Sequence, residues 1–210
     1  MKFKMKNLKN YQDFINESYY EDLFLLKSLA QKLFKYKDKE FDEPIKISEL
    51  VKDKEFDIIK DFMEQVKFEM KEPANIFSAN GMYSSDSHEK EYKGGIHIIT
   101  IFGKNINYII HELRHAFDDY RTNGKFNNSH KSSNIRWYDE KNYNNQHHEK
   151  DAKFDEIISD TDLNKDIKDI IKDIKNSYYW NKFNDDNQKR LLKRLYKIYH
   201  QFHQEKSEKN

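Results

Sequence analysis

Two histidines, His111 and His115, stand four residues apart in a segment, residues 106–121, that contains neither glycine nor proline. Apolar side chains recur in this segment at helical spacing: Ile109, Ile110, Leu113, Ala116 and Phe117. The pattern predicts an amphipathic helix. Residues at positions i and i+4 of a helix lie one above the other, so both imidazole rings are expected on the same side. The chain must therefore fold around a helix that presents two imidazoles toward one point.

Glu112 follows His111 directly and completes the pattern His-Glu-x-x-His. On a helix, this pattern lets two imidazoles bind one metal ion while the carboxylate reaches a water molecule beside the ion. The sequence thus predicts a hydrolase with one Zn²⁺ ion, in which Glu112 takes a proton from water and delivers it to the leaving amine. The competing interpretation is a solvated or core-satisfied histidine pair on a helix.

The chain contains no cysteine, so any metal site must be built from histidine, aspartate and glutamate. A catalytic zinc site needs a third protein ligand and keeps one position for water. In the extended pattern HExxHxxGxxH, that ligand falls at Arg121 and the glycine at Asp118, which excludes this variant. The third ligand is therefore expected on a later segment.

A later predicted helix, residues 147–159, carries the candidates for the third ligand. Glu149 and Asp151 each offer a carboxylate, and His147 and His148 each offer an imidazole. Both ligand types suit zinc, so the residue types leave all four side chains open as metal ligands.

Residues 94–158 resemble the gluzincin type of zincin metallopeptidases, including compact ones of phages and bacteria. The resemblance rests on HExxH, a tyrosine, a short polar stretch and an acidic helix that begins near Glu149. It implies that Glu149 is the third zinc ligand and that Asp151 replaces the second acid of the family's Glu-x-Glu-Ala helix. His147 stands where the family often has a proline, which leaves Asp151 open as an alternate ligand.

The same resemblance implies that Tyr143 donates a hydrogen bond to the oxyanion of the reaction, with His130 as the second choice. Tyr143 has a structural alternative as a packing residue. Asp118 or Asp119 is expected to accept the outer N–H of His115, or else to lie as a surface charge on the last helical turn.

The apolar and β-rich patterns along the rest of the chain predict an α+β, zincin-like fold in a single domain, residues 1–210. Two β-rich runs, residues 75–84 and 95–102, predict a small antiparallel sheet packed on the active-site helix. Periodic apolar residues predict flanking helices at 11–37, 48–71, 162–176 and 185–203, with a frayed tail after them. The domain then divides into a helical N-terminal part (1–72), a sheet and active-site core (73–160) and C-terminal helices (161–210).

The strand at residues 96–102 resembles the zincin edge strand, which pairs with an extended peptide, and this implies a protein or peptide substrate. Because the strand is apolar on both faces, a buried central strand is the alternative. The long polar loop at residues 125–146 is expected to form one wall of the substrate cleft.

Charge and hydropathy restrict the other partners. There are 38 Lys and Arg against 37 Asp and Glu, so neither nucleic acid nor a membrane surface is expected as a partner. No apolar run has the length of a signal peptide or a membrane-spanning helix, which predicts a soluble, cytoplasmic protein.

The opening residues 8–18 resemble the starts of proteins of large tailed bacteriophages, so a host cytoplasm or a virion is the expected setting. The alternative functions are a non-catalytic zincin-fold binding or virion-associated protein, and a narrow regulatory protease that cuts a repressor.

Overall fold

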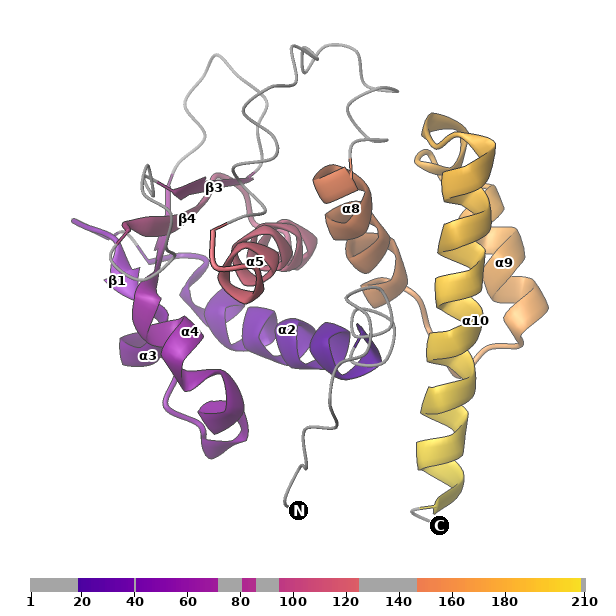
Figure 1. Ribbon diagram of the computed structural model, residues 1–210, viewed down its shortest axis with the longest axis horizontal. Coiled ribbons are helices and arrows are strands. Elements are labelled where there is room, and N and C mark those ends of the chain that lie inside the picture. The colour runs from indigo at the N-terminus through magenta and orange to yellow at the C-terminus, as the bar shows by residue number, and fades with distance from the viewer. Residues whose placement is uncertain (1–18, 40, 72–80, 86–94, 125–146, 209–210) are drawn as a thin grey trace.

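The computed structural model describes residues 19–39, 41–71, 81–85, 95–124 and 147–208, which are coloured in Figure 1. Within these ranges the chain forms seven α-helices and one four-stranded sheet, so the predicted α+β class is confirmed. No helix in these ranges has the length and apolar character needed to cross a membrane.

The sheet has the strand order β1-β2-β4-β3. Its strands are β1 (Ile45–Lys46), β2 (Val66–Met70), β3 (Gly81–Ser85) and β4 (His97–Ile101). β3 and β4 pair antiparallel, as the sequence predicts, but β2 pairs parallel to β4. The expectation of a purely antiparallel sheet is therefore wrong. β4 is a central strand, paired on both sides, and β3 is an edge among the strands that the structure describes.

The prediction of a single helix over residues 48–71 is also wrong. This segment holds most of α3 (Ile47–Leu50), the 3₁₀ helix η2 (Lys54–Ile59), α4 (Lys60–Gln65) and strand β2. Val66, Phe68 and Met70 fit a helical pattern together with the preceding apolar residues, but they also alternate as a strand does. The segment forms a strand because it pairs parallel to β4, and this pairing buries all three side chains.

The bounds of the long helices agree more closely with the sequence prediction. α2 (Tyr19–Leu33) lies within its predicted range, and α5 (Ile106–Arg121) and α8 (His147–Ser159) have their predicted bounds. α9 (Ile167–Lys175) begins later than predicted, and α10 (Asp185–Glu208) continues through the tail that was expected to fray. Contacts with the segment before α9 hold this end of α10: His203 Nε2 lies 2.9 Å from the Leu163 carbonyl oxygen, and Lys206 Nζ donates to Asn164.

α5 occupies the middle of the molecule, with the sheet on one side and α8 on the other (Figure 1). One hydrophobic core joins the sheet to α2, α4 and α5, and a second joins α8, α9 and α10 to the start of α2. The two faces of α5 therefore meet different partners, and a side chain on α5 can meet residues of both β3 and α8.

Local sequence sets both ends of α5. At the N-terminus, the side-chain oxygen of Asn105 accepts from the backbone N–H of Asn107, as N-cap residues do. At the C-terminus, Asn123 and Gly124 have φ angles of 53° and 77°, and the N–H of Gly124 donates to the carbonyl of Asp119. This left-handed ending satisfies carbonyls of the last turn.

Candidate metal centre

Three side chains converge where α5 meets α8. His111 Nε2 lies 3.0 Å from His115 Nε2 and 3.2 Å from Glu149 Oε2. His115 Nε2 lies 3.6 Å from the other oxygen of Glu149. The three side chains are only 12%, 11% and 8% exposed, so little solvent separates the donor atoms. In the part of the chain that the structure describes, this is the group of histidine and acidic side chains that could hold a metal ion.

The donor set fits a zinc ion in chemistry and in size. Two imidazole nitrogens and one carboxylate oxygen are a common ligand set of catalytic zinc. A tetrahedral ion with bonds of about 2.0–2.1 Å separates its ligand atoms by about 3.3 Å. The separations of 3.0, 3.2 and 3.6 Å in the cluster bracket this value. Three protein ligands also leave one tetrahedral position for water.

Acidic side chains surround His111 on several sides. Burial opposes a positive charge on its ring, but the carboxylates of Glu149 and Glu156 and the charge of Glu112 outweigh burial and raise the pKa to about 10. These carboxylates stabilise a positive charge at this place, which either a proton or a metal ion can supply.

Glu112 leaves α5 on the side of the sheet, toward the edge strand β3. The backbone N–H of Tyr83 donates to its carboxylate, and Gly81 lies against its side chain. Burial raises the pKa of Glu112 above the ordinary range of a carboxyl; Glu149 adds to this, and the two histidines oppose it. A carboxylate with a raised pKa, held next to the histidine pair, is a better proton acceptor than an ordinary carboxylate.

Glu156 contacts the opposite edge of the His111 ring, and the sequence interpretation missed it. Its Oε2 lies 3.5 Å from His111 Nδ1 and 2.5 Å from the ammonium nitrogen of Lys153. Burial disfavours the charge of Glu156, but His111 and Lys153 outweigh burial and lower its pKa. A carboxylate on the outer nitrogen of a metal-binding imidazole fixes the ring orientation. The spacing gave a signal, because Glu156 follows Glu149 by seven residues and shares its helical face.

A buried ion pair joins the two helices of the site. Arg114, inside the His-Glu-x-x-His pattern, donates through Nε to Asp155 of α8, and the two side chains are 2% and 0% exposed. Arg114 also donates to Asp118, one turn further along α5, at 3.3 Å. Because the three residues of the cluster come from α5 and α8, this ion pair helps to hold the two helices in the relative position that brings the cluster together.

Asp118 and Asp119, the predicted partners of His115, have other contacts. Asp118 accepts from Arg114, and Asp119, which is fully buried, accepts from the hydroxyl of Tyr83 at 2.9 Å. The Tyr83 hydroxyl also lies 2.8 Å from Nδ1 of the buried His97. Tyr83 thus ties the edge strand β3 to both α5 and β4 beside Glu112.

Of the other predicted metal ligands, the structure describes the side chain of Asp151. Asp151 faces α10 and accepts from Arg194 at 3.0 Å, away from the histidine pair, because it lies two positions after Glu149 and hence on nearly the opposite helical face. His147 and His148 begin α8, but their side chains are not among those that the structure describes. Tyr143 and His130, and with them the loop at residues 125–146, also lie outside the described residues.

Comparisons with protein-family models, curated proteins and solved structures found no match to this chain.

Proposed function

We propose that the protein is a zinc-dependent metallopeptidase with a zincin-like active site. The observation that carries this proposal is the convergence of His111, His115 and Glu149 beside Glu112. A structural histidine pair needs neither a third ligand from another helix nor a buried acid on the adjoining helical face. The His-Glu-x-x-His pattern and the match of the donor separations to zinc support the same conclusion.

In the proposed mechanism, a bound zinc ion supplies the Lewis acid that polarises the scissile carbonyl and makes water acidic. Glu112 takes a proton from water at the site, because burial raises its pKa and so makes its carboxylate a stronger base. The same carboxyl then delivers this proton to the leaving amine. The N–H of Tyr83 orients the carboxylate of Glu112 during both transfers.

The proposed substrate is a protein or an extended peptide. β4 is paired on both sides, so we assign the pairing edge to β3, whose residues also contact Glu112. Tyr143 is proposed, by the gluzincin resemblance, as the donor to the oxyanion.

Hydrolysis of a peptide library by the zinc-loaded protein tests this function. The wild type is expected to cleave, and Glu112→Gln is expected to bind zinc equally well but to cleave at least about 100-fold more slowly, since general acid–base catalysis contributes that much. Glu64→Gln, an exposed glutamate on α4, is the matched control and should leave cleavage unchanged. Cleavage by Glu112→Gln at the wild-type rate contradicts the mechanism. Zinc binding without any cleavage by the wild type favours a non-catalytic binding protein instead.

A further inference from the structure

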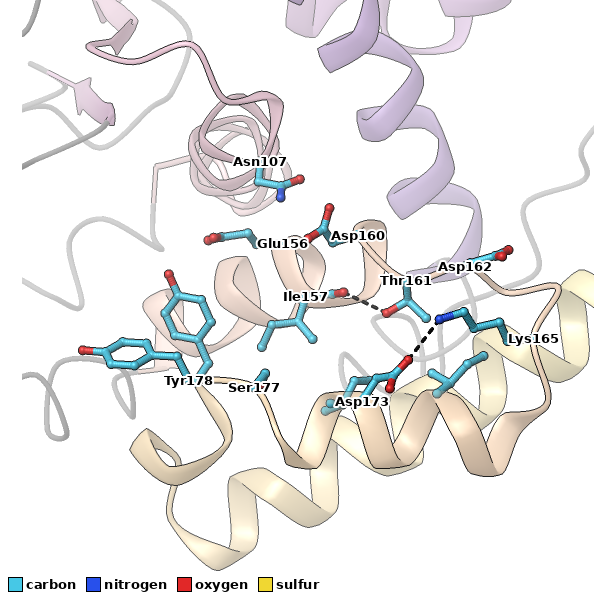
Figure 2. Close-up of a pocket in the computed structure, with 13 residues that line it drawn as sticks. Asn107, Glu156, Ile157, Asp160, Thr161, Asp162, Lys165, Asp173, Ser177 and Tyr178 are labelled. Carbon is cyan, nitrogen blue, oxygen red and sulfur yellow. Dashed lines mark hydrogen bonds and ion pairs between the residues drawn. The ribbon is translucent and has the colours of Figure 1, made fainter.

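The two sides of the histidine pair are packed differently. On the side of α8 and α9, Glu156 lines a cavity of about 380 Å³ that extends from the first turn of α5 to α9 (Figure 2). On the side of the sheet, the side chains near Glu112 include His97 and Asp119, which are both buried. The groups that can fix the position of Glu112 are therefore found on the sheet side.

Tyr83 holds the edge strand β3 to α5 at two points. Its backbone N–H donates to the carboxylate of Glu112, and its hydroxyl donates to Asp119 at 2.9 Å. Glu112 and Asp119 are seven residues apart, so they lie on the same face of α5, about 10.5 Å apart along its axis. One residue of β3 thus spans nearly two turns of the site helix. A slip of the strand along the helix breaks at least one of the two contacts.

His97 contacts the same hydroxyl from the neighbouring strand β4. Its Nδ1 lies 2.8 Å from the Tyr83 hydroxyl oxygen, and the two rings are nearly parallel, with an angle of 9° between their planes. A hydroxyl has one proton to donate, and a carboxylate can only accept. Because Tyr83 donates its proton to Asp119, the Nδ1 of His97 carries a proton and donates it to Tyr83. The hydrogen bonds therefore run in one direction, from His97 through Tyr83 to Asp119.

Burial makes this network of His97, Tyr83 and Asp119 specific for one position of β3. Asp119 is 0% exposed and His97 is 1% exposed, so bulk water does not reach either group to replace the hydroxyl. A buried polar group that loses a hydrogen-bond partner is costly, and linked hydrogen bonds strengthen one another. The network therefore disfavours every placement of the strand in which the Tyr83 hydroxyl leaves Asp119 or His97.

We propose that Tyr83 is a positioning residue for Glu112 and acts through its side-chain hydroxyl. The hydroxyl sets the position of β3 along α5, and this position places the Tyr83 N–H on the Glu112 carboxylate. The three candidate metal ligands belong to α5 and α8, so the network positions the acid without holding the ligands. The effect on hydrolysis rests on the proposed peptidase function, whereas the hydrogen bonds can be measured without zinc or substrate.

Hydrogen exchange and nitrogen NMR of the full chain without zinc test the positioning directly. In the wild type, the amide of Tyr83 is expected to exchange slowly, and Nδ1 of His97 is expected to carry a proton. Tyr83→Phe keeps the ring and removes the hydroxyl. The amide at position 83 should then exchange at least about tenfold faster, while that of Phe68, in the central strand β2, stays protected.

Tyr36→Phe is the matched control, because it also removes one hydroxyl, which donates to the Leu50 carbonyl outside the site. It should leave the exchange of the Tyr83 amide unchanged. An unprotonated Nδ1 of His97 overturns the proposal, as does equal exchange at position 83 in the wild type and Tyr83→Phe.

The kinetic test uses the zinc-loaded protein and separates kcat from KM. A bound peptide moves with the strand that it pairs with, whereas Glu112 belongs to α5, so a displaced β3 misplaces the acid but keeps substrate binding. Tyr83→Phe is expected to lower kcat about tenfold, with KM and zinc content near the wild-type values. Asp119→Asn keeps an acceptor for the hydroxyl and should retain more activity than Asp119→Leu.

An unchanged kcat in Tyr83→Phe, or an equal loss of kcat in Tyr36→Phe, overturns the positioning role. A wild type that cleaves no peptide contradicts the peptidase function instead. In that case the exchange of the Tyr83 amide still decides whether the hydroxyl holds β3 against Glu112.

Discussion

Gly81 lies so close to Glu112 that a Cβ at this glycine comes within 2.9 Å of the Glu112 Cγ and 3.0 Å of its Oε1. Real Cβ contacts are longer, so any side chain at position 81 must displace the acid or the strand. Only a residue without a side chain lets the edge strand β3 approach the site helix this closely.

Gly81→Ala is therefore expected to move the Glu112 carboxylate while leaving the three metal ligands in place. Zinc content should stay near the wild-type level, whereas peptide hydrolysis should fall by about 10- to 100-fold, the effect of a small misplacement of a catalytic group. Zinc analysis and kcat/KM measured on one preparation check this. Gly103→Ala, at a glycine that faces Tyr108, is the matched control and should change neither quantity strongly. An unchanged kcat/KM in Gly81→Ala would show that the contact does not position the acid.

Glu156→Gln is expected to weaken zinc binding about 10- to 100-fold, because it removes the charge that orients His111 from its outer nitrogen. Lys153→Met should act in the same direction through Glu156. Competition with a chelator measures the affinities. Equal zinc affinity of the wild type and Glu156→Gln would show that this carboxylate does not support the metal site.

Asp155→Ala is expected to destabilise the fold by about 3–5 kcal/mol, since it leaves the charge of Arg114 buried without its partner. Removal of both charges, in Arg114→Met with Asp155→Leu, should cost less than the single change. Urea denaturation of the three proteins checks the order. If the double variant is the least stable of the three, the attraction between Arg114 and Asp155 exceeds the cost of removing both charges from water.

Asp118 predicts a pH dependence of stability. Burial raises its pKa from 3.8 to about 6; Asp151 and Asp155 add to this and Arg114 opposes it. The folded protein therefore keeps a proton on Asp118 that the unfolded chain releases near pH 4, so the free energy of unfolding falls as the pH rises from about 4 to 6. A shift of about two pKa units corresponds to at most about 3 kcal/mol, and screening at this partly exposed side chain reduces it.

Asp118→Asn removes this contribution, so the difference in unfolding free energy between wild type and variant should change over pH 4–6 and stay constant above pH 7. Denaturation curves at several pH values measure this difference. A difference that is constant over the whole range would contradict the raised pKa.

Local sequence was sufficient to predict α5 and the pairing of His111 with His115, because both depend on the spacing within one helix. The bounds of α8 were predicted from its helical spacing, and the α+β class from local helical and β-rich patterns together. β2 was not, since its apolar residues fit two periods and the choice depends on parallel pairing with β4, a contact between distant segments.

The candidate third ligand, Glu149, could not be singled out from the residue pattern alone. Glu149 and Asp151 have the same chemistry and lie on the same helix, so their residue types could not separate them. The rotation of α8 separates them: Glu149 faces α5 and Asp151 faces Arg194 of α10. That rotation depends on the packing of α8 between two other helices. Glu156 could have been found from its spacing, because it shares the face of Glu149.

Zinc-edge X-ray absorption of the zinc-loaded wild type, Glu149→Gln and Asp151→Asn tests the metal centre most directly. The wild type and Asp151→Asn are expected to give one zinc ion per chain, with two imidazole nitrogens and a carboxylate oxygen at about 2.0–2.1 Å. Glu149→Gln is expected to lose the carboxylate ligand and to bind zinc far more weakly. A wild-type spectrum without two imidazoles, or an unchanged spectrum in Glu149→Gln, would contradict the proposed site.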